Sequence, residues 1–408
     1  MTEQTTSKVP RIQFTGFLGE WEEKALGDLF PITSAARVHK HEWTKSGVPF
    51  FRSSDVVSHF KGNENTKAFI SHELYQELSE KVGRIKKGDM LVTGGGSIGI
   101  PYLVKTDEPL YFKDADLLWF KIRDAVDSHY LYTFFSTDLF RRYLRSISHI
   151  GTIAHYTVEQ AKNTPLRLPK TLTEQTQIGE YFRELDRLIG LHQRKHDKLV
   201  TLKKAMLQKM FPQPGATTPE IRFKGFSGVW VEKKLGEVGA FNPKEALPEV
   251  FEYVDLESVV GTEMVNHRTE TRKTAPSRAQ RLARQGDLFF QTVRPYQKNN
   301  HLFTLLFTNY VFSTGYAQIR PFNDGSFILG LMQRDQFVKV VLDHCTGTSY
   351  PAINANVLAE ILVMIPTPEE QQKIGTYFRA LDALISKHAI QLQKLQQLKS
   401  ACLEKMFI

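Results

Sequence analysis

Cysteine is scarce in this sequence: only Cys345 and Cys402 occur in 408 residues. One pair cannot build a disulfide framework, and neither residue has the closely spaced Cys or His partners of a structural zinc site. We therefore expect two reduced thiols packed in the core.

Long apolar runs are also absent, since no stretch approaches the roughly 20 residues that span a bilayer. The first residues, Met1–Lys8, are polar and lack the apolar segment of a signal peptide. A composition of 41% hydrophobic and 24% charged residues is typical of a soluble globular protein. We expect no membrane span, a cytoplasmic protein and a disordered tail over residues 1–9.

Catalytic motifs are missing as well. The glycine-rich stretch 93–99 has no lysine to meet nucleotide phosphates, so it is not a Walker loop, and a tight turn is the plain alternative. The sequence has no Asn/Asp-Pro-Pro-aromatic phrase, no Gly-x-Gly-x-x-Gly after a strand and no His-Glu-x-x-His. The thirteen histidines are scattered, with His39 and His41 the closest pair. We therefore expect no catalytic residue, metal or cofactor in this chain.

What the sequence does have is an excess of positive charge, with 53 Lys and Arg against 44 Asp and Glu. A net charge of +9 attracts polyanions, because basic side chains release counterions when they neutralise phosphates. Charge alone is weak support for nucleic-acid binding, since many basic proteins bind none.

The sequence also contains an internal repeat, in two kinds of phrase. The stretch 10–21, PRIQFTGFLGEW, returns as 219–230, PEIRFKGFSGVW. A longer match aligns 174–211 with 370–407 at a constant offset, with identity at 21 of 38 positions. A fainter match pairs Gly88-Asp89 with Gly286-Asp287, whereas the segments around these matches differ.

These repeats divide the chain. The Pro/Gly/Thr-rich run 212–219 cannot continue a helix and reads as a linker between two copies. We predict a tail over 1–9, a globular domain over 10–170 and a long helix over 171–211. After the linker follow a second globular domain over 220–366 and a second long helix over 367–408.

Both long segments begin with a capping box, Thr171-x-x-Glu174 and Thr367-x-x-Glu370. Apolar residues then recur at steps of three, four and seven, as in a coiled-coil seam. A core-facing helix is the alternative, but about 60 Å of unbroken helix is too long for it. The predicted interface residues are Ile178, Phe182, Leu185, Ile189, Leu199, Met206, Ile374, Phe378, Leu381, Ile385, Leu395 and Met406.

The two long helices are expected to pair with each other, packed as an antiparallel coiled coil with pseudo-two-fold symmetry. Each globular segment mixes short strands with amphipathic helices. We expect strands at 89–92, 117–122, 287–293 and 317–319, and helices over 128–146 and 327–344. The predicted fold class is α+β in both domains.

The two duplicated phrases, Phe-x-Gly-Phe-x-Gly-x-Trp and Glu-Gln-x-x-Ile-Gly-x-Tyr-Phe-Arg-x-Leu-Asp, resemble those of the specificity subunit of type I restriction-modification systems. The resemblance extends from Pro10 to Phe407. It implies a target-recognition domain in each copy, with each domain reading one half of an asymmetric bipartite site in double-stranded DNA.

The resemblance also implies partners. The helices would space the domains and hold modification (methyltransferase) subunits, two per chain, to which restriction subunits attach. The chain itself would be non-catalytic, and S-adenosylmethionine, ATP and Mg would bind to the partner subunits.

Candidate DNA contacts in the first copy are basic residues and the glycine loop. The resemblance places such a loop near DNA, and glycines let the backbone approach a phosphate. Charge clusters are more often simply solvated. The candidates are Arg37, Lys40, Arg52, Ser53, Thr93, Gly94, Gly95 and Ser97.

In the second copy the loop 291–300 replaces the glycine loop and is rich in side chains that pair with base edges. An ordinary polar surface loop is the alternative. A repeated Gly-Thr at 347–348 and a basic cluster near 270 complete the set. The candidates are Arg268, Arg272, Lys273, Gln291, Arg294, Tyr296, Lys298, Asn299, Asn300, Thr348 and Tyr350.

Two other functions stay open. The duplicated domains could belong to a DNA-modifying enzyme, a nuclease or a methyltransferase, although the motifs of these enzymes are missing. The chain could also be a coiled-coil scaffold without DNA specificity, in which case DNA affinity would lack a strong dependence on salt.

Overall fold

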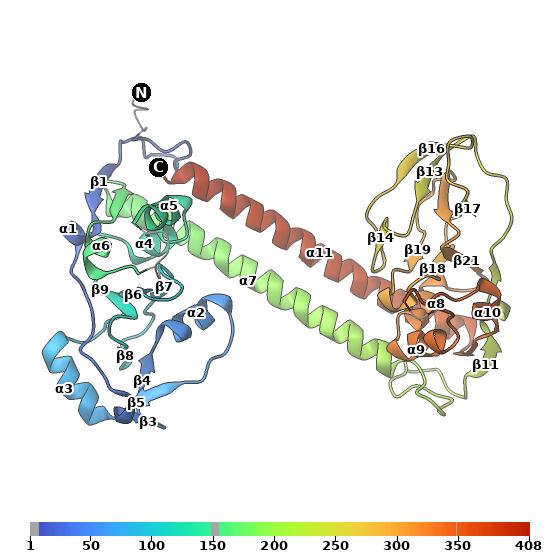
Figure 1. The fold of residues 1–408 in the computed structure, drawn as a ribbon, viewed down its shortest axis with the longest axis horizontal. Coiled ribbons are helices and arrows are strands. Elements are labelled where there is room, and N and C mark those ends of the chain that lie inside the picture. The colour runs from blue at the N-terminus through green and yellow to red at the C-terminus, as the bar shows by residue number, and fades with distance from the viewer. Residues whose placement is uncertain (1–7, 148–154, 348) are drawn as a thin grey trace. The chain divides into compact units, whose positions relative to one another are not determined.

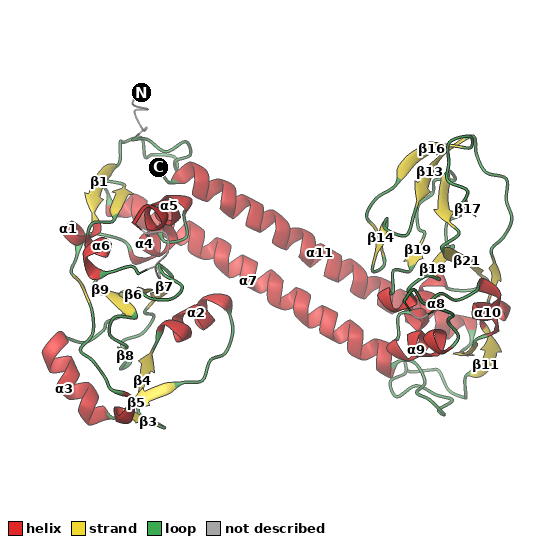
Figure 2. Ribbon diagram, viewed as in Figure 1, coloured by secondary structure: helices red, strands yellow, loops and turns green. Residues whose placement is uncertain are grey.

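The structure is a computed structural model that describes residues 8–147, 155–347 and 349–408. The chain forms two compact units, one of residues 1–192 with 391–408 and one of residues 193–390. Each unit mixes helices and strands, as Figures 1 and 2 show, and each contains a part of both long helices, α7 (Leu172–Lys209) and α11 (Pro368–Met406). The predicted α+β class is confirmed.

Among its described residues the first unit has the strands β1 (Glu22–Ala25), β2 (Ile32–Thr33), β3 (Trp43–Thr44), β4 (Val48–Phe51), β5 (Ala68–Ile70), β6 (Met90–Thr93), β7 (Pro101–Leu103), β8 (Tyr111–Phe112), β9 (Leu117–Phe120) and β10 (Pro165–Leu168). Its shorter helices are α1 (Leu26–Leu29), η1 (Lys40–Glu42), α2 (Ser53–Lys61), α3 (His72–Val82), α4 (Ser128–Phe134), α5 (Asp138–Ile147) and α6 (Val158–Lys162). They surround a sheet of order β2-β9-β6-β7, a sheet of order β3-β5-β4-β8 and the pair β1-β10.

The second unit holds β11 (Val231–Lys234), β12 (Gly239–Phe241), β13 (Val250–Val254), β14 (Val259–Val260), β15 (Glu263–Met264), β16 (Arg268–Thr271), β17 (Ala279–Leu282), β18 (Leu288–Gln291), β19 (His301–Leu302), β20 (Tyr310–Ser313), β21 (Tyr316–Pro321) and β22 (Leu362–Ile365). Its shorter helices are η2 (Leu235–Glu237), η3 (Pro295–Gln297), α8 (Gly325–Met332), α9 (Asp335–Asp343) and α10 (Ala355–Glu360). The sheet β12-β21-β18-β19 has the antiparallel neighbours of β2-β9-β6-β7, and β11-β22 matches β1-β10. The two units therefore share one framework.

The expected helices over 128–146 and 327–344 are wrong in one respect, because each is broken in two. At the first break Thr137 donates its hydroxyl to the carbonyl of Phe134 at 2.7 Å and accepts from the amide of Phe140 at 3.3 Å. A Thr side chain that replaces backbone partners in this way ends one helix and begins the next. At the second break Arg334 donates to the carbonyl of Pro212 in the linker at 2.9 Å.

The duplicated phrases are explained by packing. Phe14 meets Tyr181 edge to face at 5.7 Å between ring centroids, and the equivalent pair Phe223 and Tyr377 lies at 5.9 Å. Trp21 packs edge to face on Phe407 at 6.2 Å, as Trp230 does on Phe211 at 6.0 Å. In each unit the Phe-x-Gly-Phe-x-Gly-x-Trp phrase thus contacts the early turns of one long helix and the residues that end the other.

The repeated glycine of the long helices permits a close approach. A Cβ atom on Gly179 would lie 2.5 Å from a carboxylate oxygen of Asp127, the residue that caps α4, and 2.6 Å from the amide nitrogen of Tyr130. On Gly375 it would lie 1.9 Å from the carboxylate of Asp324, which caps α8. The N-terminus of a short helix, α4 or α8, therefore rests directly on a long helix in both units.

The long helices pack antiparallel within each unit. In the first unit Ile178, Phe182 and Leu185 share a buried core with Cys402 and Met406. In the second unit Ile374, Phe378 and Leu381 share a buried core with Met210. Early turns of one helix therefore contact late turns of the other, as the sequence predicts. The remaining predicted interface residues are half-buried: Ile189, Leu199, Met206, Ile385 and Leu395.

The structure also bears on smaller expectations. Cys402 is buried and Cys345 is half-buried, and both are free thiols. No helix within the described ranges is both long and apolar enough to cross a membrane. Of the tail expected over 1–9, residues 1–7 lie outside the described residues, whereas the carbonyl of Lys8 accepts a hydrogen bond from the amide of Trp21 at 2.8 Å.

Candidate nucleic-acid interface

The glycine loop of the first unit follows β6 directly. The hydroxyl of Thr93 donates to the carbonyl of Ser97 at 2.5 Å and accepts from the amide of Ile100 at 2.9 Å, so it closes the loop from inside. Gly94 is buried, and a Cβ atom there would lie 2.8 Å from the carbonyl oxygen of Tyr156. Thr93 and Gly94 therefore shape the loop, and the expectation that they contact DNA stays a prediction.

The outer part of the same loop remains accessible. Ser97 is exposed and Gly95 is half-exposed. Gly99 closes the loop against α5, because a Cβ atom there would lie 2.5 Å from Leu144 and 2.8 Å from Phe140. DNA contact by Gly95 and Ser97 stays a prediction.

The basic candidates of the first unit differ in exposure and in the contacts that their side chains already make. Lys40 is exposed on η1, and Arg37 is 69% exposed while paired with Asp114 at 3.0 Å. Arg52 forms a two-pronged ion pair with Asp55, at 2.8 and 3.0 Å, and the hydroxyl of Ser53 donates to the carbonyl of Asp116 at 2.8 Å. Arg52 and Ser53 are engaged in holding the start of α2, whereas Arg37 and Lys40 can reach a ligand.

In the second unit the loop after β18 occupies the position of the glycine loop, since β6 and β18 are equivalent strands. Gln291 is 2% exposed and donates its amide to the carbonyl of Val293 at 2.7 Å and to Gln297 at 2.8 Å. Asn300 is 1% exposed, and its side-chain oxygen accepts from the amide of Gln291 at 2.9 Å. Both side chains lie inside the loop in this structure, and base contact by Gln291 and Asn300 stays a prediction.

The surface of this loop is formed by other candidates. Arg294 and Lys298 flank η3 with φ angles of 54° and 57°, a left-handed conformation that side chains other than glycine rarely adopt. Such backbone persists only where the surroundings enforce it, and it clusters at binding sites. Tyr296 between them is 49% exposed.

Two of the loop residues hold the loop in place. Lys298 donates to the carbonyl of Gln333 at 3.0 Å and forms an ion pair with Asp335, and Asn299 accepts from the amide of Gly261 at 2.8 Å. Both side chains bind the loop to neighbouring segments of the second unit.

Tyr350 supports Arg294 from a different segment. The guanidinium carbon of Arg294 lies 4.4 Å from the centre of the Tyr350 ring, and Tyr350 is 62% exposed. The amide of Arg294 also donates to the carbonyl of Pro351 at 2.8 Å. Thr348, the other candidate in this segment, lies outside the described residues. Arg294, which is half-buried, and the exposed Tyr296 and Tyr350 are the candidates at the surface of this loop.

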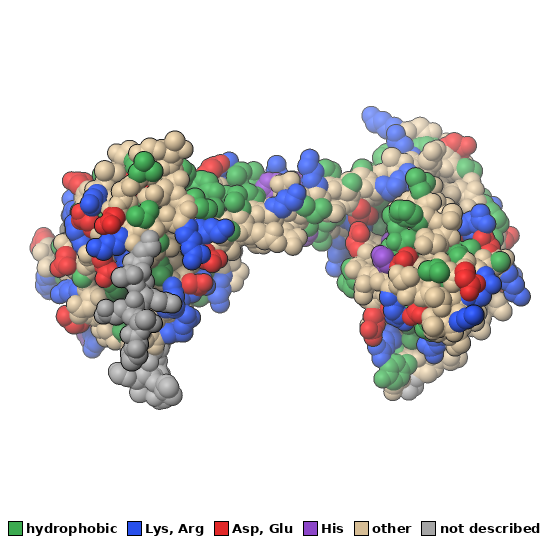
Figure 3. All heavy atoms as spheres, turned by 90° about the horizontal axis from the view of Figure 1, so that it is seen from above, with side chains coloured by type: hydrophobic (Ala, Val, Ile, Leu, Met, Phe, Trp, Pro, Cys, Tyr) green, Lys and Arg blue, Asp and Glu red, His purple; other side chains and the backbone are tan. Residues whose placement is uncertain are grey.

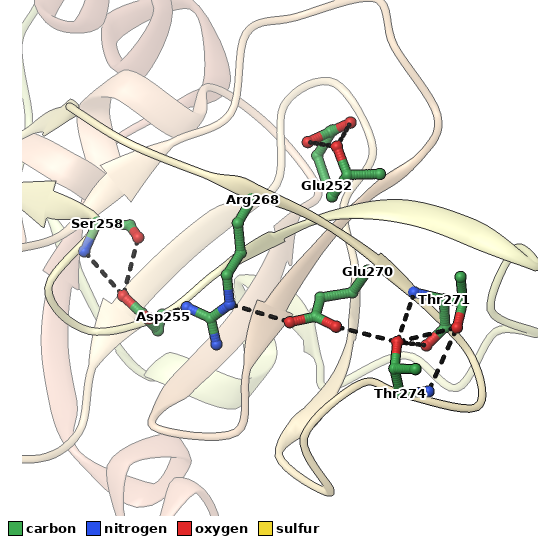
Figure 4. A network of polar contacts seen from close by, with 8 residues as sticks. Glu252, Asp255, Ser258, Arg268, Glu270, Thr271 and Thr274 are labelled. Carbon is green, nitrogen blue, oxygen red and sulfur yellow. Dashed lines mark hydrogen bonds and ion pairs between the residues drawn. The ribbon is translucent and has the colours of Figure 1, made fainter.

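The basic cluster around β16 is neutralised by acidic neighbours. Arg268 bridges Asp255 at 2.7 Å and Glu270 at 3.0 Å (Figure 4). Burial opposes ionisation of Asp255, but hydrogen bonds from Ser258 and Arg268 outweigh it, so the pKa of this carboxyl lies below its usual value. Arg268 is therefore committed to a network within the domain.

The other two members of this cluster are less enclosed. Arg272 donates to the carbonyl of Leu247 and lies 4.0 Å from Glu249, whereas Lys273 is exposed. Lys273 is the more available of the two for a phosphate.

The structure adds basic residues that the sequence candidates omit. Arg141, Arg142 and Arg145 are exposed on α5, whose opposite side packs into the core through Phe140 and Leu144. The signal was present as Arg-Arg-x-x-Arg on an amphipathic helix.

No group of three or more His, Cys, Asp or Glu residues that could hold a metal ion occurs within the ranges that the structure describes. The nearest pair, His39 and His41, stacks ring on ring at 5.5 Å between centroids.

Comparison with known proteins identifies relatives for most of this architecture. The family model of the type I restriction modification DNA specificity domain matches residues 19–201 and 278–399, well over half of the chain. A type I restriction enzyme specificity subunit of Haemophilus influenzae is 30% identical over 155 residues, which is 38% of this chain and 37% of the relative. The HindI specificity subunit of the same organism is 24% identical over 192 residues, 44% of this chain and 41% of the relative. The chain thus spans about two fifths of each relative's length.

One solved structure shows the same fold, and a second matches the chain less closely. The crystal structure of a type I restriction-modification system S subunit from M. genitalium matches with a TM-score of 0.57 at 15% identity, covering 98% of this chain and 99% of that one. An HsdS subunit from Thermoanaerobacter tengcongensis matches with a TM-score of 0.43 at 17% identity, over 95% and 96% of the two chains. From the matched family model, this chain belongs to the family of type I restriction modification DNA specificity domains.

Proposed function

We propose that this chain is the sequence-reading subunit of a type I restriction-modification complex in the cytoplasm, and that it binds an asymmetric bipartite site in double-stranded DNA. One observation carries the proposal. Two units share one framework, yet equivalent strands end in different surface loops, Gly95–Ser97 after β6 and Arg294–Tyr296 after β18. Different loops on one frame would read different half-sites.

In this proposal the chain performs no chemistry. Modification subunits, two per chain, would bring S-adenosylmethionine, and restriction subunits attached to them would bring ATP and Mg. The duplicated helix contacts support two equivalent docking positions, because Tyr181 and Tyr377, the equivalent tyrosines of α7 and α11, make the same ring contacts in the two units. Enzymatic activity of the purified chain alone on DNA, with S-adenosylmethionine or a divalent metal, would contradict it.

The test is a domain exchange followed by mapping of methylated bases in the host genome. Residues 26–165 are replaced by the matching segment of another family member, and the complex is formed with its own modification subunits. The exchange should change one half-site and leave the other. A change in both half-sites would contradict the one-domain-per-half assignment, and the absence of any sequence preference in the parent complex would contradict the proposal as a whole.

A further inference from the structure

A basic groove lies on the first unit, apart from the loops considered above. It has a volume of about 880 Å³ and is lined by α5, the N-terminal segment and the last turns of α11. Figure 3 shows Lys and Arg side chains on one face of the first unit, with Asp and Glu side chains among them. Six cationic side chains line the groove, Arg11, Arg141, Arg142, Arg145, Arg167 and Lys405, against two acidic ones, Asp138 and Glu404.

Most of these cations form no ion pair with another residue that the structure describes. Arg167 pairs with Glu23 at 2.7 Å, and Arg141 lies 3.5 Å from Asp138, which is 84% exposed. Within the described part of the chain, no carboxylate lies at ion-pair distance from Arg142 or Arg145. Exposed guanidinium groups without a carboxylate partner keep their N–H donors available for the oxygens of an anion such as phosphate.

The groove is a property of the first unit alone. The equivalent position of the second unit is a smaller pocket of about 350 Å³ in which Lys209 and Arg334 balance Glu220 and Asp335. Along the helix, Arg141 corresponds to Val338 and Arg145 to Leu342, because α5 and α9 both begin at Asp and bury Phe140 and Phe337. A protein partner that docks in the same way on both units would meet these arginines on the first unit alone, so the extra positive charge does not fit such a partner.

The helix that carries the arginines is fixed next to the predicted DNA loop. Gly99, the last residue of the glycine loop, contacts Leu144 and Phe140 of α5 so closely that a Cβ atom would overlap them. The hydroxyl of Tyr143 donates to the carbonyl of Gln160 at 2.8 Å and holds the same helix from a second side. The arginines therefore stand on the exposed side of a helix whose core-facing side holds Gly99, the last residue of the glycine loop.

We infer that this groove binds the phosphate backbone of duplex DNA that flanks the half-site read by the first unit, through Arg141, Arg142 and Arg145. The inference rests on the proposed function. Arginine forks match phosphate oxygens in two-pronged geometry, and such contacts add affinity without sequence preference. One side of the bipartite site is thus bound over a longer stretch of duplex than the other.

The experiment uses the complete complex with its modification subunits and two duplexes of equal length, one with the mapped bipartite site and one with that site scrambled. Affinity is measured over a series of salt concentrations. The slope of log affinity against log salt is negative, and each lost phosphate contact reduces its magnitude by about 0.9. We expect Arg142→Gln to reduce this magnitude by about that amount and the triple variant R141Q/R142Q/R145Q by up to about 2.7, equally on both duplexes, with the methylated sequence unchanged.

Two controls separate charge from structure. Lys339 on α9 corresponds to Arg142 on α5, and Lys339→Gln should leave the slope unchanged. The triple Arg→Lys variant keeps the charge on α5 and should retain most of the slope if the glutamine variants act through phosphate rather than through folding.

Other outcomes overturn the inference. An unchanged slope in the triple glutamine variant means that these arginines do not bind DNA. If the triple glutamine variant no longer binds the modification subunits but the chain keeps its affinity for DNA, the groove binds an acidic protein surface instead. A parent complex without preference for the bipartite duplex contradicts the proposed function, but the slope on the scrambled duplex still decides whether the groove binds phosphate.

Discussion

The ammonium group of Lys399 lies 2.6 Å from a carboxylate oxygen of Asp186 and joins α11 to α7 within the first unit. The repeat makes the same pair again in the second unit, where Lys203 lies 2.5 Å from Asp382. Both lysines stand at apolar seam positions of the helix pair and are about one fifth exposed. Each lysine in the seam meets its carboxylate in only one alignment of the two helices. The pair therefore helps to fix their register.

This relationship predicts a measurable coupling. In a double-mutant cycle with Asp186→Asn and Lys399→Met, we expect a coupling energy of about 0.2–1 kcal/mol in urea unfolding, because the pair is partly exposed. The cycle with Asp382→Asn and Lys203→Met should give a similar value, and the two should add, since they share no partners. Zero coupling in both cycles would mean that the pairs do not contribute to helix pairing.

The close approach at the repeated glycines predicts a steric effect. Gly179→Ala would place its Cβ atom 2.6 Å from the backbone nitrogen of Tyr130, which cannot move without shifting α4. We expect a loss of about 1–3 kcal/mol in the free energy of unfolding, although alanine favours helix by about 1 kcal/mol. Gly375→Ala should behave alike.

The matched control for the glycine prediction is Gly190→Ala in the same helix. Its equivalent in α11 is Ser386, so this position already carries a side chain in the other copy. The control should be neutral or stabilising by up to about 1 kcal/mol. If Gly179→Ala proved as stable as the control, the close contact between α4 and α7 would be absent in solution.

The two tryptophans of the duplicated phrase are equivalent in sequence but not in bonding. The indole nitrogen of Trp21 donates to Glu174 at 3.3 Å, whereas Glu370 is held by Arg222 at 2.7 Å and the buried indole nitrogen of Trp230 has no hydrogen-bond partner within the described residues. Trp→Phe should therefore lower the free energy of unfolding by about 1–2 kcal/mol more at position 21 than at position 230, because only the first change removes a hydrogen bond to a carboxylate. Thermal or urea unfolding of the two variants compares them directly, and equal losses would contradict the difference in bonding.

Part of this fold follows from the sequence and part does not. The long helices and their seam could be predicted because Ile178, Phe182 and Leu185 repeat at helical spacing. The role of the repeated Gly-Asp turn could not. Asp89 is fully buried and accepts from the indole of Trp119 at 2.9 Å, and Asp287 is fully buried and paired with Arg320 at 2.7 Å. Those partners lie about thirty residues along the chain, and no local pattern connects them.

The candidate contacts show the same limit. Residue type identified Gln291, Asn300 and Arg294 alike as base-reading side chains, because amides and guanidinium groups match base edges. Which of them reach the surface depends on how the loop folds on itself: the amides of Gln291 and Asn300 satisfy backbone groups inside it, and Arg294 points to the ring of Tyr350. The folding of an irregular loop is not encoded in periodicity or composition.

Glu174 predicts a dependence of stability on pH. Burial raises the pKa of this carboxyl above 4.5, and the hydrogen bond from Trp21 only partly opposes the effect. A carboxyl with a higher pKa in the folded state binds its proton more tightly there, so its contribution to stability is complete below the unfolded pKa and is lost as pH rises through the folded pKa. Glu174→Gln should therefore gain stability relative to the parent between about pH 4 and pH 7.

The control for the pH series has the opposite sign. Glu184 is exposed beside Arg187, and the hydrogen bond from that guanidinium lowers the pKa of the carboxyl. Its contribution is complete above the unfolded pKa of 4.5 and is lost on acidification below it, so Glu184→Gln should lose stability relative to the parent as pH rises to 4.5 and show little further change above it. Urea unfolding at several pH values measures both, and parallel trends for the two variants would refute the assignment.

Arg294 predicts where base recognition by the second unit is concentrated. Its guanidinium rests on the ring of Tyr350 and forms no ion pair within the described ranges, so it can meet a base edge, whereas Arg268 is occupied by Asp255 and Glu270. If the proposed function holds, Arg294→Ala should weaken binding of the bipartite duplex by about ten- to a hundredfold, the range of one good base contact, and relax the preference in one half-site. Arg268→Ala should change affinity little. Competition binding with duplexes altered in one half at a time measures both effects, and an equal loss on every sequence would make Arg294 a backbone contact instead.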